Sequence, residues 1–237
     1  TMIIKVCGMT QPANIAEVAE AGADWIGFVF YPPSPRFVGM IPSQTGLLPD
    51  RARPLCLPDG VKKAGVFVDA SAQDIITRVV NFGLDIVQLH GDEPPTMLRN
   101  LRRTLEGGIR PGVKLVKAIS ISSAGDMARC ADYEDCADLL LFDTRCPGAG
   151  GSGRQFDWSV LNAYSGSLPF MLSGGIGPGD EERVAALAHP KLAGVDLNSR
   201  FETAPGVKDA ALTGKFIARL RELTQTHTDT ENQKTRI

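Results

Sequence analysis

Short apolar runs recur along the whole chain, and a polar or amphipathic segment separates each run from the next. Eight runs stand out: MIIKV (2–6), WIGFVF (25–30), AGVFV (64–68), DIVQLH (85–90), KLVKAI (114–119), DLLLFD (138–143), PFMLS (169–173) and AGVDL (193–197). Runs of this length, rich in β-branched residues, are typical of strands that are buried on both faces of a sheet. Their alternation with helical segments predicts parallel βαβ units.

The segments between the runs carry helical patterns with recognisable starts and stops. In PANIAEVAEAG, Pro12 suits a first helical turn, the apolar positions share one face, and Gly22 supplies a stop. SAQDIITRVVNFG repeats this design, with Ser71 as a candidate N-cap and Gly83 as the stop. Prolines break the segment 41–59, which therefore predicts only a short or irregular second helix.

An internal echo favours a closed barrel. AGADWIGFV, FGLDIVQLH and DCADLLLFD each place an aspartate before a strand and recur every roughly 55–60 residues, the length of two βα units. We therefore expect an α/β fold, a (β/α)8 or TIM barrel, as a single domain over residues 1–224. A doubly wound sheet that binds dinucleotides would have G-x-G-x-x-G after its first strand, which CGMTQPAN is not. The polar stretch 225–237 lacks apolar periodicity and predicts a disordered tail.

Composition narrows the range of partners. The net charge of the 237 residues is −2 and lysines and arginines cluster in pairs at most, so we expect neither nucleic acid nor a membrane surface as a partner. No apolar stretch approaches the roughly 20 residues of a spanning helix, and the chain does not start like a signal peptide. The sequence thus predicts a cytoplasmic protein with a small-molecule ligand, and a monomer because no long apolar surface stripe is visible.

Cysteine and histidine spacing gives no metal signature. The five cysteines form no C-x-x-C pair, and the three histidines are scattered without H-E-x-x-H spacing. We therefore expect neither a disulfide framework nor a metal site.

Polar residues at the ends of the predicted strands are the candidates for chemistry, since the C-terminal ends form the active face of such a barrel. Cys7 ends the first strand, where it is either a buried filler or a thiol that ionises beside a positive charge. Asp143 ends the sixth; a low-dielectric site would raise its pKa and suit a general acid, and pairing with a barrel lysine is the alternative. Lys5 lies deeper and is expected to pair with Asp196, because strand eight adjoins strand one.

The loops offer further candidates. LSGGIGPGD after the seventh strand has bare amides that suit an anion, or glycines that only make a turn. PGAGGSGRQFDW is either a flap over the ligand or an ordinary loop. Arg36, in a proline-rich loop, is able to bind a carboxylate through two hydrogen bonds or is simply solvated. The role of His90 is open in the same way: it is either a site residue or a core histidine whose ring donates to a backbone oxygen.

Nine motifs, in order from residue 5 to 209, resemble the phosphoribosylanthranilate isomerase family of tryptophan biosynthesis. They are KVCGMT, GADWIGFVFYPPSPRFV, AGVFVD, QLHGDE, KAISI, LFDT, GGSGRQFDW, LSGGI and PGVKD. The resemblance implies a (β/α)8 barrel that converts N-(5-phosphoribosyl)anthranilate to 1-(2-carboxyphenylamino)-1-deoxyribulose 5-phosphate, an Amadori rearrangement, without cofactor or metal.

The resemblance also implies roles for individual residues. Cys7 would be the general base, Asp143 the general acid, and Arg36 the group that holds the anthranilate carboxylate. His90 would belong to the substrate site. The phosphate would be bound by Gly151, Ser152, Gly153, Gly174, Gly175, Asn198 and Ser199.

Two positions depart from the family pattern. Arg200 stands where a glycine is usual, which implies either strain at a positive φ or an added charge near phosphate. Arg154 replaces a common lysine and keeps its charge. Alternative functions are the histidine-pathway Amadori isomerase, indole-glycerol phosphate synthase, and a phosphate-binding barrel without turnover. The retained acid and base argue against the last of these.

Overall fold

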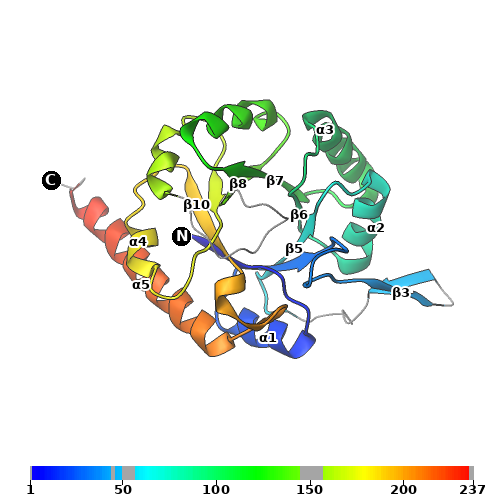
Figure 1. Ribbon diagram of the computed structural model, residues 1–237, viewed down its shortest axis with the longest axis horizontal. Helices are drawn as coiled ribbons and strands as arrows, with labels where there is room; N and C mark the ends of the chain where they lie inside the picture. The colour runs from blue at the N-terminus through cyan, green and yellow to red at the C-terminus, as the bar shows by residue number, and fades with distance from the viewer. Residues whose placement is uncertain (1, 44–45, 50–56, 145–156, 235–237) are drawn as a thin grey trace.

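Eight parallel strands close into a barrel around the centre of the molecule (Figure 1). The computed structural model describes residues 2–43, 46–49, 57–144 and 157–234. The strands are β1 (Ile3–Val6), β2 (Trp25–Val29), β5 (Lys62–Phe67), β6 (Ile86–Leu89), β7 (Lys114–Ile121), β8 (Leu139–Thr144), β9 (Phe170–Leu172) and β10 (Leu192–Leu197). β10 pairs with β1 and closes the ring. All eight runs predicted as strands form strands, and the (β/α)8 barrel is confirmed.

Helices surround the barrel and cover the outer side of the strands (Figure 1). They are α1 (Pro12–Glu20), α2 (Ala72–Phe82), α3 (Pro95–Thr104), η1 (Leu105–Ile109), η2 (Ala124–Tyr133), η3 (Trp158–Ala163), α4 (Glu181–Ala185), η4 (Ser199–Phe201) and α5 (Ala210–Lys234). The boundaries of α2 follow the sequence prediction. The Ser71 side chain accepts a hydrogen bond from the backbone N–H of Asp74, and Gly83 ends the helix at φ 59°.

The expected second helix is wrong in its described part. β3 (Met40–Ser43) and β4 (Gly46–Pro49) instead form an antiparallel hairpin that projects from the barrel (Figure 1). Proline has no backbone N–H to donate within a helix, but it is tolerated in a two-stranded ribbon, where every strand is an edge. Residues 50–56 lie outside the described part of the chain.

The C-terminal helix continues past the expected domain boundary. α5 extends to Lys234, so residue 224 lies within the helix and the stretch to residue 234 has a helical backbone. Among the described helices, none combines the length and the apolar character needed to cross a membrane.

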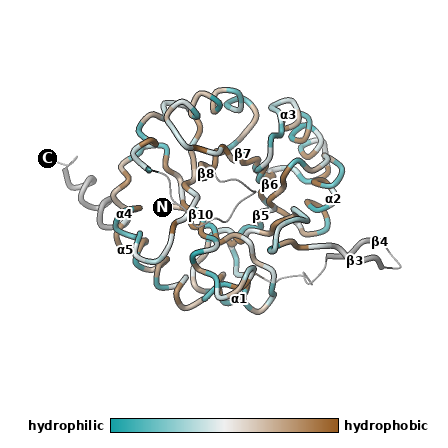
Figure 2. Tube along the Cα trace, viewed as in Figure 1, coloured by the Kyte–Doolittle hydropathy of each residue, from teal (hydrophilic) through white to brown (hydrophobic). Residues whose placement is uncertain are grey.

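The core has an apolar shell between strands and helices and a mixed barrel interior. Figure 2 shows hydrophobic residues concentrated on the strands and hydrophilic residues frequent along the outer helices. Toward the N-terminal ends of the strands, a separate apolar cluster includes Trp25, Ile86, Leu139 and Met171. Buried polar side chains are also present, namely Lys5, Gln88, Lys117 and Asp196. Because such groups are costly to bury unpaired, their contacts show how the site is organised.

Candidate active site

The candidate residues lie at the C-terminal ends of the strands, where barrels of this fold place their active sites. Cys7 follows β1, His90 follows β6, and Asp143 belongs to β8. The glycine pair follows β9, and Asn198 and Ser199 follow β10. Gly151, Ser152, Gly153 and Arg154 lie outside the described residues.

Glycines on both sides make room for Cys7. A Cβ atom on Gly27 would lie 2.8 Å from the Cys7 Sγ, so β2 approaches the thiol only because Gly27 has no side chain. Gly8 has φ +76°, and a Cβ there would lie 2.5 Å from Arg36 Cδ and 2.8 Å from Asn198 Oδ1. The sharp turn predicted at Gly8 is therefore present, and it also lets Arg36 and Asn198 close over the turn.

Cys7 is buried, with 4% of its surface exposed, rather than the accessible thiol that one sequence interpretation required. Burial raises the pKa of the Cys7 thiol because it disfavours the thiolate. The Lys5 ammonium lowers this pKa, the Asp196 carboxylate raises it, and Lys208 lowers it, with the pKa raised on balance. The positive charges expected beside Cys7 are thus present, but they offset only part of the cost of burial.

Lys5 pairs with Asp196, as the barrel closure predicts. Its Nζ lies 2.8 Å from Asp196 Oδ2 and 2.7 Å from Gln88 Oε1. Burial is the largest effect on Lys5 and opposes its charged form, but the Asp196 carboxylate and Cys7 together outweigh it, so the pKa of Lys5 is raised and the ammonium form is favoured.

Asp143 contacts His90 across the barrel opening. Asp143 Oδ2 lies 3.2 Å from His90 Nε2, and the other ring nitrogen, Nδ1, lies 3.0 Å from Gln88 Nε2. Both ring nitrogens of His90 therefore face side chains. The alternative interpretation, a core histidine that donates to a backbone oxygen, does not match these contacts.

Arg36 is not a solvated loop residue. It is 9% exposed, and its Nε and Nη2 donate to the two carboxylate oxygens of Glu202 at 2.7 and 2.6 Å. Lys208 Nζ donates to Glu202 Oε1 at 2.6 Å and to Asn198 Oδ1 at 2.9 Å. A buried cluster of Arg36, Glu202 and Lys208 thus ties the loop after β2 to Asn198 after β10.

Sequence reasoning missed several members of this site. Gln88 lies in β6, two residues before His90, which directly follows that strand, so the alternation of side chains was an available signal. Glu202 and Lys208 lie in the short strands β11 (Glu202–Ala204) and β12 (Val207–Lys208). Glu202 contacts Arg36 across 166 positions of sequence, and no local pattern predicts this contact.

The loop after β9 has the backbone that its glycines predict. Gly174 and Gly175 have φ values of 90° and 71°. Arg200 packs on this loop, since a Cβ on Gly177 would lie 2.9 Å from Arg200 Nε. Among the described residues, Asp69 is the one non-glycine with positive φ, so Arg200 is not strained as one interpretation proposed. The other interpretation, a charge beside the glycine loop, agrees with its position.

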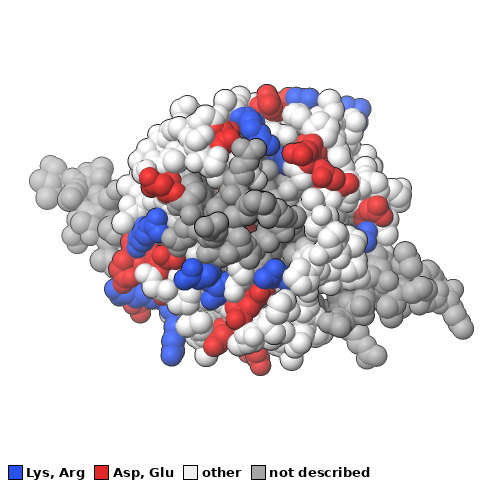
Figure 3. Space-filling model, in the orientation of Figure 1, with Lys and Arg blue, Asp and Glu red and all other residues white. Residues whose placement is uncertain are grey.

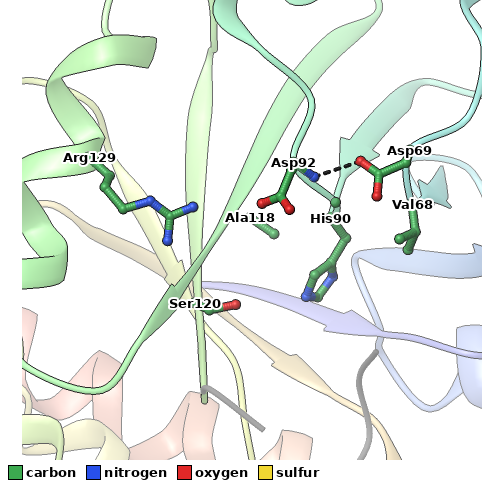
Figure 4. A pocket seen from close by; sticks show the side chains of 8 residues that line it. Val68, Asp69, His90, Asp92, Ala118, Ser120 and Arg129 are labelled. Carbon is green, nitrogen blue, oxygen red and sulfur yellow. Dashed lines mark hydrogen bonds between the residues drawn. The ribbon is translucent and has the colours of Figure 1, made fainter. Parts of the chain in front are cut away.

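A polar cavity of about 240 Å³ adjoins His90 on this face (Figure 4). It is lined by Val68, Asp69, His90, Gly91, Asp92, Ala118, Ser120 and Arg129. In Figure 4 the Arg129 guanidinium points from η2 into the same opening as His90. Figure 3 shows acidic and basic side chains interspersed around this face of the molecule. In the described ranges, no group of three or more His, Cys, Asp or Glu residues is placed to hold a metal ion.

Comparison with known proteins agrees with this geometry. A protein from Phocaeicola vulgatus named N-(5'-phosphoribosyl)anthranilate isomerase is 42% identical over 224 residues, which cover 94% of this chain and 100% of that protein. The solved phosphoribosyl anthranilate isomerase from Thermus thermophilus has a TM-score of 0.76 and 29% identity, covering 94% of this chain and 100% of that one. A solved isomerase in complex with reduced 1-(o-carboxyphenylamino)-1-deoxyribulose 5-phosphate has a TM-score of 0.74, 29% identity and the same coverage.

The family model also matches nearly the whole barrel. The model described as N-(5'phosphoribosyl)anthranilate (PRA) isomerase matches residues 4–219, which run from β1 into α5. The matched segment includes every candidate residue discussed above. The chain therefore belongs to the N-(5'-phosphoribosyl)anthranilate isomerase family.

Proposed function

We infer that the chain catalyses the Amadori rearrangement of N-(5-phosphoribosyl)anthranilate to 1-(2-carboxyphenylamino)-1-deoxyribulose 5-phosphate in tryptophan biosynthesis. The family match over residues 4–219 carries this inference. A thiol, a carboxylate and a glycine loop at the ends of β1, β8 and β9 support it, since the reaction needs a base, an acid and a phosphate site.

Asp143 is the proposed general acid. Opening the ribose ring requires a proton on the ring oxygen, and the nitrogen lone pair then forms a protonated Schiff base. Asp143 lies at the end of β8 beside His90, where a carboxylic acid is able to face a sugar bound in the barrel mouth. The His90 contact gives the carboxylate that remains a hydrogen-bond partner.

Cys7 is the proposed general base. The cationic Schiff base acidifies the hydrogen on the second sugar carbon, and the thiolate removes it to give an enolamine that tautomerises to the ketone. The raised pKa of Cys7 makes the free thiolate scarce. A cation formed beside Cys7 favours the thiolate at the step where the base is needed.

The proposed binding groups flank this acid and base. Arg36 uses Nε and Nη2 for Glu202, so the end of its guanidinium that carries Nη1 is the edge proposed for the anthranilate carboxylate. The proposed phosphate site comprises the residues after β9 and β10, Gly174, Gly175, Asn198 and Ser199, together with Gly151, Ser152 and Gly153. The charge of Arg200 beside the glycine loop would strengthen anion binding there.

The location and oligomeric state are further proposals. We propose that the protein acts in the cytoplasm, as expected of a biosynthetic enzyme with a small substrate, and that it is a monomer. In the described part of the chain, the exposed large hydrophobic side chains are Val80 and Ile109 alone, which supports a surface without an apolar interface.

The direct test is the loss of anthranilate-type fluorescence when the purified protein meets phosphoribosyl anthranilate generated in situ. Fast decay with formation of the deoxyribulose product is the expected result. Tight binding of the reduced product analogue without any decay would instead indicate a binding barrel that does not turn over its ligand.

A further inference from the structure

A continuous chain of polar contacts crosses the barrel from Asp143 to Asp196. His90 links Asp143 to Gln88, with Nε2 to Oδ2 at 3.2 Å and Nδ1 to the Gln88 Nε2 at 3.0 Å. Lys5 links Gln88 to Asp196, with Nζ at 2.7 Å from Gln88 Oε1 and 2.8 Å from Asp196 Oδ2. Lys5 and Gln88 are 1% and 2% exposed, so water does not compete for these bonds.

The chemistry of each group fixes the direction of every bond in the chain. An ammonium group only donates, so Gln88 must turn its Oε1 to Lys5 and its amide N–H groups to His90. An amide nitrogen also only donates, so Nδ1 of His90 must accept. A neutral imidazole has one donor and one acceptor, which leaves its proton on Nε2, facing Asp143.

We propose that Lys5 and Gln88 hold His90 as the neutral tautomer with its proton on Nε2, which makes His90 a permanent hydrogen-bond donor to Asp143. Gln88 is then a positioning residue for the general acid. This inference rests on the proposed function only where it assigns that role to Asp143; the tautomer itself follows from the contacts of His90.

The fixed tautomer prevents His90 from accepting the proton of the general acid. An ordinary imidazole is about 2.6 pKa units more basic than an aspartate, so an unrestrained histidine beside a general acid would take its proton and abolish the acid. With Nδ1 occupied by the Gln88 amide, a second proton on the ring would set two N–H groups against each other. His90 therefore does not compete for the proton, and it stabilises the carboxylate left after proton transfer.

Charge alone would not produce this state. Asp143 on β8 and Asp196 on β10 face the ring of His90, and Asp69 and Asp92 line the adjoining cavity with it. The surrounding cations are Lys5 on β1, Arg129 on η2 and Lys117, which donates to the carbonyls on either side of His90. Charges of both signs surround the ring, so hydrogen-bond direction decides its state.

His189 supplies an internal reference for the same tautomer. Its Nε2 lies 3.1 Å from the carbonyl oxygen of Tyr164, and its Nδ1 accepts from the backbone N–H of Lys191 at 3.1 Å. Backbone donors and acceptors cannot exchange roles, so His189 also carries its proton on Nε2. It precedes β10 and so lies near the N-terminal ends of the strands, at the end of the barrel away from the acid and base.

Nitrogen NMR of histidine-labelled protein tests the proposal without any substrate. The chain has three histidines, which single His→Gln substitutions assign. We expect His90 and His189 to give the same pattern near neutral pH, protonated at Nε2 and bare at Nδ1. A His90 signal with the proton on Nδ1, or on both nitrogens near neutrality, would overturn the proposal.

Gln88→Glu is the decisive variant, because a carboxylate in the same place accepts from both Lys5 and His90. We expect the Nδ1 of His90 to become protonated while the signals of His189 stay unchanged. Asn14→Asp is the matched control: it also replaces a buried amide by a carboxylate, but its partners are the backbone of Lys208 and the side chain of Glu17, so the His90 signals should not move. Unchanged His90 signals in Gln88→Glu would contradict the proposal.

Kinetics then connects the tautomer to the acid. Gln88→Glu should lower kcat by about 10- to 100-fold with little change in KM, since Gln88 orients a group that acts on the reacting atoms and does not bind substrate. A parental kcat in a variant whose His90 has changed tautomer would refute the positioning role. Absence of turnover in the parent would count against the proposed function, and the spectra would still decide the tautomer.

Discussion

The thiol of Cys7 sits among charges that act on it in opposite directions. Burial and Asp196 raise its pKa, and Lys5 and Lys208 lower it. The sequence predicted the rim position of Cys7 and a nearby positive charge, but not the degree of burial. Burial depends on Gly27 of the neighbouring strand, whose missing side chain admits the sulfur, and no pattern around Cys7 itself indicates this.

Removal of one of these charges should shift the pH at which Cys7 becomes active as a base, and with it the pH dependence of kcat/KM. Lys208→Met deletes an ammonium that lowers the pKa of Cys7, so the thiolate should form only at higher pH than in the parent. We expect the rise of kcat/KM with pH to move to higher pH in this variant, measured as a pH profile of the initial rate. A rise that stays in place or moves to lower pH would show that Cys7 is not the group that titrates.

The proposed role of Arg36, binding of the anthranilate carboxylate, can be tested separately from the proton transfers. Arg36→Lys keeps the charge but loses the planar edge that binds a carboxylate through two bonds. We expect KM to rise by about 10- to 100-fold, the effect of roughly 1.5–3 kcal/mol for a hydrogen bond to a charged group, with a smaller change in kcat. Inorganic phosphate, which has no anthranilate, should inhibit both proteins equally; an unchanged KM would remove Arg36 from the carboxylate site.

At the scale of elements, strand predictions succeeded because the barrel strands are largely buried on both faces and read as short, mostly apolar runs. The segment after β2 failed because its prolines exclude a helix without specifying what replaces it, and the β3–β4 hairpin depends on pairing between two short stretches. The conformations of the loops after β5 and β6 were not predicted either. They are held by Glu93, which accepts from the backbone N–H groups of Asp69 and Gly91 and pairs with Lys117.

This buried pair should be a large contributor to the stability of the barrel. Lys117 and Glu93 lie 2.9 Å apart with fully buried side chains. Lys117→Met leaves the Glu93 charge uncompensated, so we expect the free energy of unfolding to fall by about 3–5 kcal/mol in urea titrations. Arg99→Met, which breaks the exposed pair with Asp135, is the control and should cost no more than about 1 kcal/mol. Equal losses in the two variants would contradict this account.

The whole molecule assembles its site from both ends of the chain. Lys5 lies in β1 and Cys7 directly follows it, and Asp196, Asn198 and the β11–β12 pair come from the end of the barrel sequence. The eight-strand count predicted that these ends meet, and the Lys5 to Asp196 pair was predicted on that basis alone. The contacts of Arg36 with Glu202 and of Lys208 with Asn198 were not predicted, because loop geometry decides them rather than strand order.

The proposed monomer is testable at this scale. The chain mass is 25.4 kDa, and light scattering coupled to size exclusion should give that mass over a wide range of concentration. Twice that mass, unchanged on dilution, would show a stable dimer and require an interface that the described surface does not reveal.

The central claim is that Cys7 and Asp143 act as the base and the acid of one isomerisation. The most direct measurement compares the decay of anthranilate fluorescence in the parent, Cys7→Ser and Asp143→Asn, with affinity for the reduced product analogue as a check on folding. We predict a loss of about 100-fold or more in kcat for each variant, with the analogue still bound. Decay at the parental rate in either variant would contradict the assignment of that residue.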